Sequence, residues 1–178
     1  LQSLNNKYVH QDGKTYFKIE HSVSYSIFLY ILSNKLYHAG VGAEYVYYLN
    51  KIMHSIDWFY AIDLPRHFGA EHPLGSVLGR ANYGDYFFLY QGCTVGGNKK
   101  NGVLYYPVIG DYCVMFSNSS IIGKCHIGNN VILASECHVK DEDIPSNCIV
   151  FGSSPNLVIK ERTETDMLQR MAEIWREK

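Results

Sequence analysis

The sequence lacks several features that would assign it to a common functional class. It contains no apolar run near the roughly 20 residues that a membrane span needs, and Leu1 opens no basic-then-apolar signal pattern. Lysine and arginine (16) balance aspartate and glutamate (17), so no basic surface for nucleic acid is expected. Its five cysteines include no Cys-x-x-Cys pair, which argues against a disulfide framework and predicts a cytoplasmic protein.

The sequence does contain a repeat of six residues. Large apolar residues recur at this interval at Ile109, Met115, Ile121, Ile127, Leu133 and Val139. Four positions after each of the first five stands a residue small enough for a crowded interior: Cys113, Ser119, Cys125, Val131 and Cys137. Gly110, Gly128 and Ala134 stand where a tight bend leaves little room. This period fits no α-helix, and it predicts a mainly β fold, a left-handed parallel β-helix of roughly four to five coils with three strands per coil.

The same count extends toward the N-terminus with one interruption. It places Val77, Tyr83, Leu89 and Val95 inside the prism and Ala81, Phe87 and Cys93 at the small positions, which Phe87 suits poorly. Between Val95 and Ile109 the interval is two residues longer than two hexads. The sequence therefore predicts a projecting loop around Asn98–Tyr106.

The flanks of the repeat have helical patterns. Residues 1–60 are expected to form an arm and two helices, which run from Ser22 to about Asp57 and join near residues 38–42. Residues 61–160 are expected to form the β-helix. In the last segment, 161–178, Thr163 and Asp166 resemble a helix cap, and one side of the helix is apolar. That side consists of Met167, Met171, Ile174 and Trp175.

Three motifs appear in order along this ladder: Asp63-Leu64-Pro65, then Glu71-His72-Pro73-Leu74-Gly75, then the run QGCTVGG that ends at Gly97. They resemble the motifs of the hexapeptide-repeat acyltransferases, within them the serine acetyltransferase group, over roughly residues 32–160. The resemblance implies an O-acetyltransferase that uses acetyl-CoA as co-substrate and no metal. It also implies a homotrimer with active sites between subunits.

The resemblance also implies roles for individual residues. His72 matches the general base that takes a proton from the acceptor hydroxyl, and Asp63 matches the aspartate that orients it, although the interval is about one hexad shorter than is usual in the family. A backbone N–H near Gly96 or Gly97 would stabilise the oxyanion. The positions that match the acetyl-CoA groove are Gly97, Ser117 and Ser135, with Lys160 near the cofactor phosphates.

The acceptor is where the sequence departs from the family. Glu71 replaces the aspartate that precedes the base, and Tyr105-Tyr106 replaces an Arg-His pair. A tyrosine cannot supply the positive charge that pairs with a carboxylate, so we expect a sugar hydroxyl, on a surface polysaccharide or its precursor, in preference to serine. The alternative is a serine O-acetyltransferase of cysteine biosynthesis in which Arg66, Arg80 or Lys99 supplies the missing charge.

Other interpretations stay open with less support. Cys125-His126 and Cys137-His138 suggest zinc, but twelve residues separate the pairs and place them on different faces of a three-sided coil. Cys93 could act as a nucleophile, yet it occupies a small inward position. An inactive trimeric β-helix scaffold is the remaining alternative, which thiol release from acetyl-CoA would distinguish from an enzyme.

Overall fold

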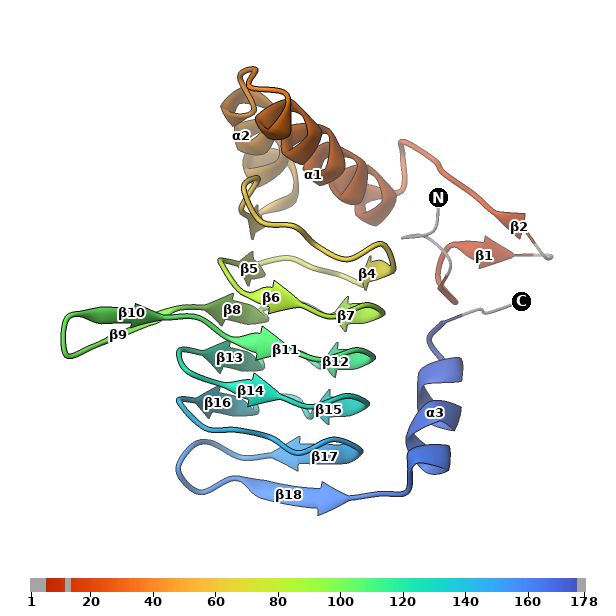
Figure 1. Ribbon diagram of the computed structural model, residues 1–178. Coiled ribbons are helices and arrows are strands. Elements are labelled where there is room, and N and C mark those ends of the chain that lie inside the picture. Colours follow the sequence, from red (N-terminus) through yellow and green to blue (C-terminus); the bar gives the residue numbers. More distant parts are fainter. Residues whose placement is uncertain (1–5, 12–13, 176–178) are drawn as a thin grey trace.

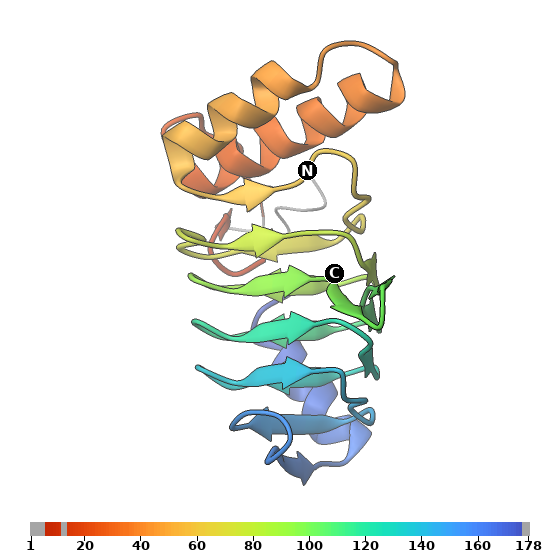
Figure 2. The same ribbon diagram turned by 90° about the vertical axis from the view of Figure 1, so that its left-hand side faces the viewer.

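The computed structural model describes residues 6–11 and 14–175. Its main body is a left-handed parallel β-helix whose coils stack into a three-sided prism (Figures 1 and 2). The six-stranded face has the order β18 (Val158–Glu161), β17 (Cys148–Phe151), β15 (Val131–Leu133), β12 (Cys113–Met115), β7 (Phe87–Leu89) and β4 (Phe68–Ala70). All its neighbours are parallel except β18, which turns back against β17.

Two further faces complete the prism. The five-stranded face has the order β16 (His138–Lys140), β13 (Ser120–Ile122), β8 (Thr94–Gly96), β5 (Val77–Leu78) and β3 (Asp57–Trp58). The three-stranded face has the order β14 (His126–Ile127), β11 (Val108–Ile109) and β6 (Asn82–Tyr83). The first strand of the prism, β3, begins slightly before residue 61, where the β-helix was expected to start.

The interior confirms the hexad from residue 109 to 139. Every predicted large and small inward residue of that stretch is buried, and so is Phe87, whose ring lies 5.3 Å from that of Tyr83 and 6.2 Å from that of Phe68. The prediction for Val77 was wrong, because its side chain is 39% exposed and Leu78 is fully buried instead. Leu78 pairs in register with Val95, one residue short of a full coil of eighteen, which shifts the inward position by one.

The flanking segments agree with the predicted pattern. Helices α1 (Ser22–His38) and α2 (Glu44–His54) pack together across one end of the prism (Figure 2). Helix α3 (Glu164–Ala172) is capped by Thr163, whose hydroxyl accepts a hydrogen bond from Asp166 N. The four predicted apolar residues are buried against the six-stranded face, but the prediction that all four lie in the helix was wrong, because α3 ends at Ala172 and Ile174 and Trp175 follow it. The predicted end of this helix at residues 176–178 lies outside the described residues.

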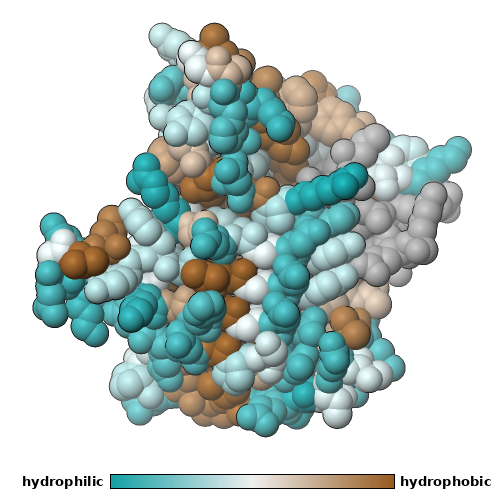
Figure 3. Space-filling view, viewed as in Figure 1, coloured by the Kyte–Doolittle hydropathy of each residue, from teal (hydrophilic) through white to brown (hydrophobic). Residues whose placement is uncertain are grey.

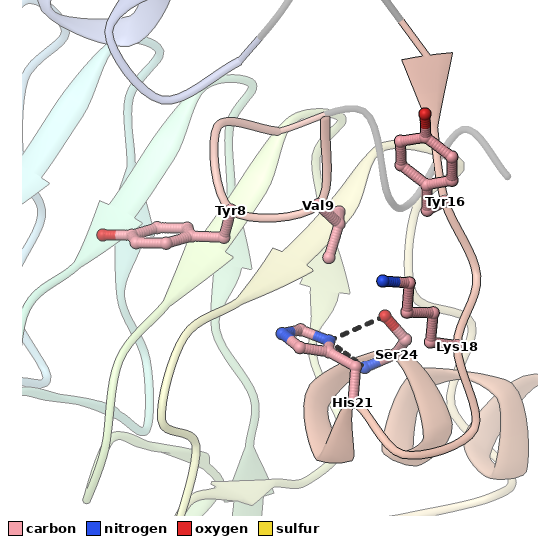
Figure 4. A pocket seen from close by; sticks show the side chains of 6 residues that line it. All are labelled: Tyr8, Val9, Tyr16, Lys18, His21 and Ser24. Carbon is pink, nitrogen blue, oxygen red and sulfur yellow. Dashed lines mark hydrogen bonds between the residues drawn. The ribbon is translucent and has the colours of Figure 1, made fainter. Parts of the chain in front are cut away.

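A cap that the sequence did not suggest starts α1. His21 Nδ1 accepts a hydrogen bond from Ser24 N at 3.2 Å and lies 2.8 Å from Ser24 Oγ, as Figure 4 shows. Both residues line a small pocket beneath the N-terminal strands β1 (His10–Gln11) and β2 (Lys14–Thr15), together with Tyr8 and Tyr16. The arm is therefore folded against the start of α1.

The predicted insertion is a two-stranded hairpin. Strands β9 (Asn98–Lys100) and β10 (Val103–Tyr105) pair antiparallel and project from the prism (Figures 1 and 3). Apolar side chains at its tip, Val103 and Leu104, are about half exposed. Over the described ranges no helix is long and apolar enough to cross a membrane.

Candidate active site

The predicted base lies on one edge of the prism. Two residues after β4, β7, β12 and β15 the chain turns from the six-stranded to the five-stranded face, and the strand register stacks these turns in one column. We call this column the His72 edge, and its residues are His72, Gln91, Ser117 and Ser135. Backbone hydrogen bonds join neighbouring turns, since Asn118 N donates to Gln91 O at 2.8 Å and Glu136 N to Ser117 O at 2.9 Å. The predicted base and two predicted cofactor residues therefore share an edge.

The turn at His72 exposes the imidazole and buries the preceding carboxyl. His72 has a left-handed φ of 48°, in addition to the left-handed residue that recurs from turn to turn at Gly75, Gly92, Asn118 and Glu136. Its side chain is 76% exposed, with Nε2 3.3 Å from Glu71 Oε1. The Glu71 side chain is only 12% exposed, Oε2 has no hydrogen-bond partner within the described chain, and burial raises the pKa of this carboxyl. Glu71 is thus the carboxylate beside His72.

A trough runs along the six-stranded side of the His72 edge. Its floor is formed by side chains of successive coils: Tyr90, Phe116, Ile132, Ala134, Ile149 and Phe151. Ser135 lies at its margin, and the cationic residues Lys7 and Arg170 also line it. Lys160 Nζ lies 5.0 Å above the ring of Phe151, at the end of the trough. Glu173 also lines the trough, but Lys7, Arg170 and Lys160 outnumber it, so this apolar strip suits a ligand with an extended arm and phosphates. The motifs did not indicate Lys7 or Arg170.

A second group of predicted residues lies at the opposite edge of the five-stranded face. Here the chain leaves β5 and β8, and an open groove is lined by residues that include Asp63, Arg80, Asn82, Tyr105 and Tyr106. Gly97 lies beneath the hairpin, because a Cβ on it would meet the Tyr106 ring at 2.9 Å. Gly96 ends β8 on the same side. We call this feature the hairpin groove.

Asp63 does not contact His72 within one chain. Its Oδ1 lies 2.8 Å from His38 Nε2 and accepts a hydrogen bond from Asn34 Nδ2 at 3.2 Å. Hydrogen bonds from His38 and then Asn34 lower the pKa of Asp63, so it is a carboxylate at neutral pH. The shortened interval explains this placement, since removal of one hexad moves a residue by one side of a three-sided coil.

Asp57, one hexad before Asp63, is the aspartate that the sequence interpretation passed over. It begins β3, its backbone N donates to Ser76 O at 2.8 Å, and it pairs in register with Val77. This places Asp57 near the His72 end of the five-stranded face. Its carboxylate accepts hydrogen bonds from Lys51 Nζ at 2.7 Å and from the Tyr47 hydroxyl. The interval to His72 could have pointed to this residue.

Among the described residues, the cysteines and the exposed histidines do not form a metal site or a reactive thiol site. All five thiols are buried, and burial raises the pKa of Cys93 and raises the pKa values of Cys137 and Cys148 to about 11. His126 and His138 point outward while their neighbours Cys125 and Cys137 point inward. Within residues 6–11 and 14–175 no three metal-ligating side chains lie together.

Comparisons with known proteins agree with the fold. No protein-family model matches the chain. A serine acetyltransferase of Synechococcus elongatus is 31% identical over 99 residues, which cover 55% of this chain and 40% of that protein. The structure of Neisseria gonorrhoeae serine acetyltransferase superimposes with a TM-score of 0.71 at 23% identity, over 83% of this chain and 59% of that one. A serine acetyltransferase in complex with CoA gives a TM-score of 0.66 at 16% identity, over 77% and 56%.

The chain spans less than two thirds of the length of each of these proteins. The resemblance suggested by the motifs is therefore confirmed: the chain is a relative of the serine acetyltransferases, with the left-handed β-helix of the hexapeptide-repeat acyltransferases.

Proposed function

We propose that this protein is an acetyl-CoA-dependent O-acetyltransferase whose acceptor is L-serine or a closely similar hydroxy amino acid. The observation that carries the proposal is the column in which an exposed His72 stands above Ser117 and Ser135 along the trough. The relatives named serine acetyltransferases support the acceptor. The trough and the similar protein solved with CoA support the donor.

In this proposal His72 removes the proton from the acceptor hydroxyl as its oxygen attacks the thioester carbonyl. The carbonyl oxygen becomes negative in the tetrahedral intermediate, where a backbone N–H near Gly96 or Gly97 would stabilise it. The C–S bond then breaks, and the CoA sulfur receives the proton held by His72. The products are the acetyl ester and free CoA, so neither a covalent enzyme intermediate nor a metal is required.

The separation of the site residues supports a shared active site. His72, Ser117 and Ser135 lie on the His72 edge, whereas Gly97 and Tyr106 lie at the hairpin groove. A homotrimer that set the His72 edge of one copy against the hairpin groove of the next would bring the two groups together. We propose this arrangement, with the active sites between subunits.

A sugar acceptor is the second candidate. The observation in its favour is that Tyr105 and Tyr106 line the hairpin groove, where their rings and hydroxyls could contact a carbohydrate. The comparisons do not support this acceptor, because the similar proteins are serine acetyltransferases. The same groove also contains Arg80, one of the three cations that the sequence offered as a source of charge for serine.

An acceptor screen tests the proposal. Release of free CoA thiol and the mass gain of the acceptor are measured with L-serine, free sugars, nucleotide sugars and oligosaccharides. The highest kcat/KM is expected for L-serine. A higher value for a sugar would replace the amino acid with the second candidate, and release at the background rate with every acceptor would leave the inactive scaffold.

A further inference from the structure

Arg80 is a cation that lines the hairpin groove. It follows β5, its side chain is exposed, and its Cζ lies 5.1 Å from the centroid of the Phe59 ring. No ion pair involves it in the described part of the chain. The turn that carries it is held by Tyr83, whose hydroxyl donates to Gly79 O at 2.7 Å. The guanidinium is therefore supported by packing, and its charge is available to a ligand.

Asp63 supplies the opposite charge to the same groove. Its side chain is 75% exposed, and His38 and Asn34 bind Oδ1. Asp63 and Arg80 both line the groove but form no ion pair with each other. The groove therefore offers one positive and one negative group that do not neutralise one another.

This pair of charges matches a zwitterion better than it matches a neutral sugar. A carboxylate needs a cationic or hydrogen-bonding partner when water is excluded, and a guanidinium binds it through two parallel hydrogen bonds. An ammonium group needs an acceptor such as a carboxylate. We infer that Arg80 binds the α-carboxylate and Asp63 the α-ammonium group of the amino acid acceptor.

This inference rests on the proposed function and deepens it, because it names the groups that select the acceptor. It also explains how a chain with Tyr105-Tyr106 in place of an Arg-His pair can use an amino acid. The cation comes from the turn after β5 instead of from the hairpin. The two tyrosines then line the groove beside the bound acceptor.

A paired-acceptor experiment tests the role of Arg80. Wild type and Arg80→Gln are compared with L-serine and with 2-amino-1,3-propanediol, in which a hydroxymethyl group replaces the carboxylate. Loss of a charged two-point contact lowers kcat/KM for L-serine on the order of 10- to 100-fold, mainly through KM, and leaves the diol within about twofold. Arg80→Lys retains the charge without the planar guanidinium. Its kcat/KM for L-serine is expected to lie between the values of wild type and Arg80→Gln.

The matched control is Lys14→Gln, which removes an exposed cation from β2 and none from the groove lining. It is expected to leave kcat/KM for both acceptors unchanged. Circular dichroism establishes that each variant folds with a melting temperature close to that of wild type. Equal losses on both acceptors in Arg80→Gln, or no loss on L-serine, would overturn the inference.

Calorimetry with L-serine separates this inference from the proposed function. If wild type releases no CoA with L-serine but binds it, and Arg80→Gln does not bind it, Arg80 is a carboxylate-binding residue and the proposed reaction fails. If wild type neither acetylates nor binds L-serine, both proposals fail. If wild type acetylates L-serine and Arg80→Gln does so equally well, the function stands and the inference is wrong.

Discussion

The His72 edge and the hairpin groove differ in what they can do for a ligand. The edge has an exposed imidazole, a buried carboxyl and an apolar trough, which suit proton transfer and an extended donor. The groove has Asp63, Arg80 and two tyrosines open to solvent, which suit recognition of a small polar acceptor. In the proposed site, the base and the groups that recognise the acceptor thus lie at opposite ends of the strands of one face. Each half is incomplete, which is the physical argument for sharing the site between copies.

The largest expected effect comes from His72. We expect His72→Ala to lower kcat by several hundredfold or more while the affinity for acetyl-CoA stays within a small factor, because general-base catalysis typically contributes about 10²–10⁴ in rate. Steady-state kinetics and calorimetry with CoA measure the two quantities. His126→Ala, which removes an exposed histidine from the three-stranded face, is the control and should retain full activity. Near-wild-type turnover in His72→Ala would remove this residue from the mechanism.

Mixed assemblies test whether the two regions act across a subunit boundary. The His72→Ala chain is coexpressed with a groove variant that carries Arg80→Gln, Tyr105→Ala and Tyr106→Ala. If sites are shared between copies, some of them combine the intact groove of the first chain with the intact His72 edge of the second. Random assortment in equal amounts would restore activity to about a quarter of wild type, because half of the edges and half of the grooves are intact. Activity no greater than the sum of the separate variants would place each site within one chain.

Asp63 distinguishes orientation of the base from binding of the acceptor. Asp63 contacts His38 and Asn34, and we infer that it binds the ammonium group of the acceptor. We therefore expect Asp63→Asn to raise KM for L-serine about tenfold with a smaller change in kcat, as for loss of one charged contact. The kcat and KM of Asp57→Asn are measured for comparison, because Asp57 lies near the His72 end of the five-stranded face. A fall in kcat comparable to that of His72→Ala would show instead that Asp63 orients His72, within or between copies.

The sequence predicted the prism better than it predicted the site. The hexad succeeded because each inward position must fill the same space in every coil, so Ile121 and Val139 repeat the environment of Val95. It failed at Val77, where a coil is one residue short. The motifs pointed to His72 and Asp63 as candidates, whereas the interval to His72, one hexad shorter than usual for Asp63, pointed to Asp57. Arg170 was not predicted, and Arg80 was only one of three candidate cations, because the settings of both depend on residues from other coils.

The third edge of the prism lies between the three-stranded and six-stranded faces. No predicted site residue lies on it, so a substitution there tests packing alone. A Cβ on Gly110 would meet the backbone of Gly128 at 2.8 Å. Gly110→Ala should lower the melting temperature by about 3–10 °C, because overpacking costs about 1–3 kcal/mol. The control Gly42→Ala adds a Cβ whose nearest neighbours lie at 3.7 Å and should shift it little. An unchanged melting temperature in Gly110→Ala would show that this edge is loosely packed.

The smallest expected effect concerns the carboxyls of the two regions, whose pKa values shift in opposite directions. Burial raises the pKa of Glu71, and the charges of His72, His21 and Lys7 oppose this only in part. The folded chain therefore holds the Glu71 proton to a higher pH than the unfolded chain does. Its contribution to the free energy of unfolding falls as pH rises from the ordinary pKa through the raised one.

The side chain introduced in Glu71→Gln cannot ionise. The free energy of unfolding of this variant should therefore not show the decline that Glu71 causes as pH rises. We expect its melting temperature to match wild type near pH 4 and to exceed it by about 1–3 °C near pH 8, measured by circular dichroism. Asp63→Asn should show the opposite sign, because the lowered pKa of Asp63 stabilises the fold above its ordinary pKa and that contribution is lost as pH falls through the lowered value. If Glu71→Gln instead melted lower than wild type near pH 8, the pairing of Glu71 with His72 would outweigh its desolvation, and Glu71 would be a structural partner of the base.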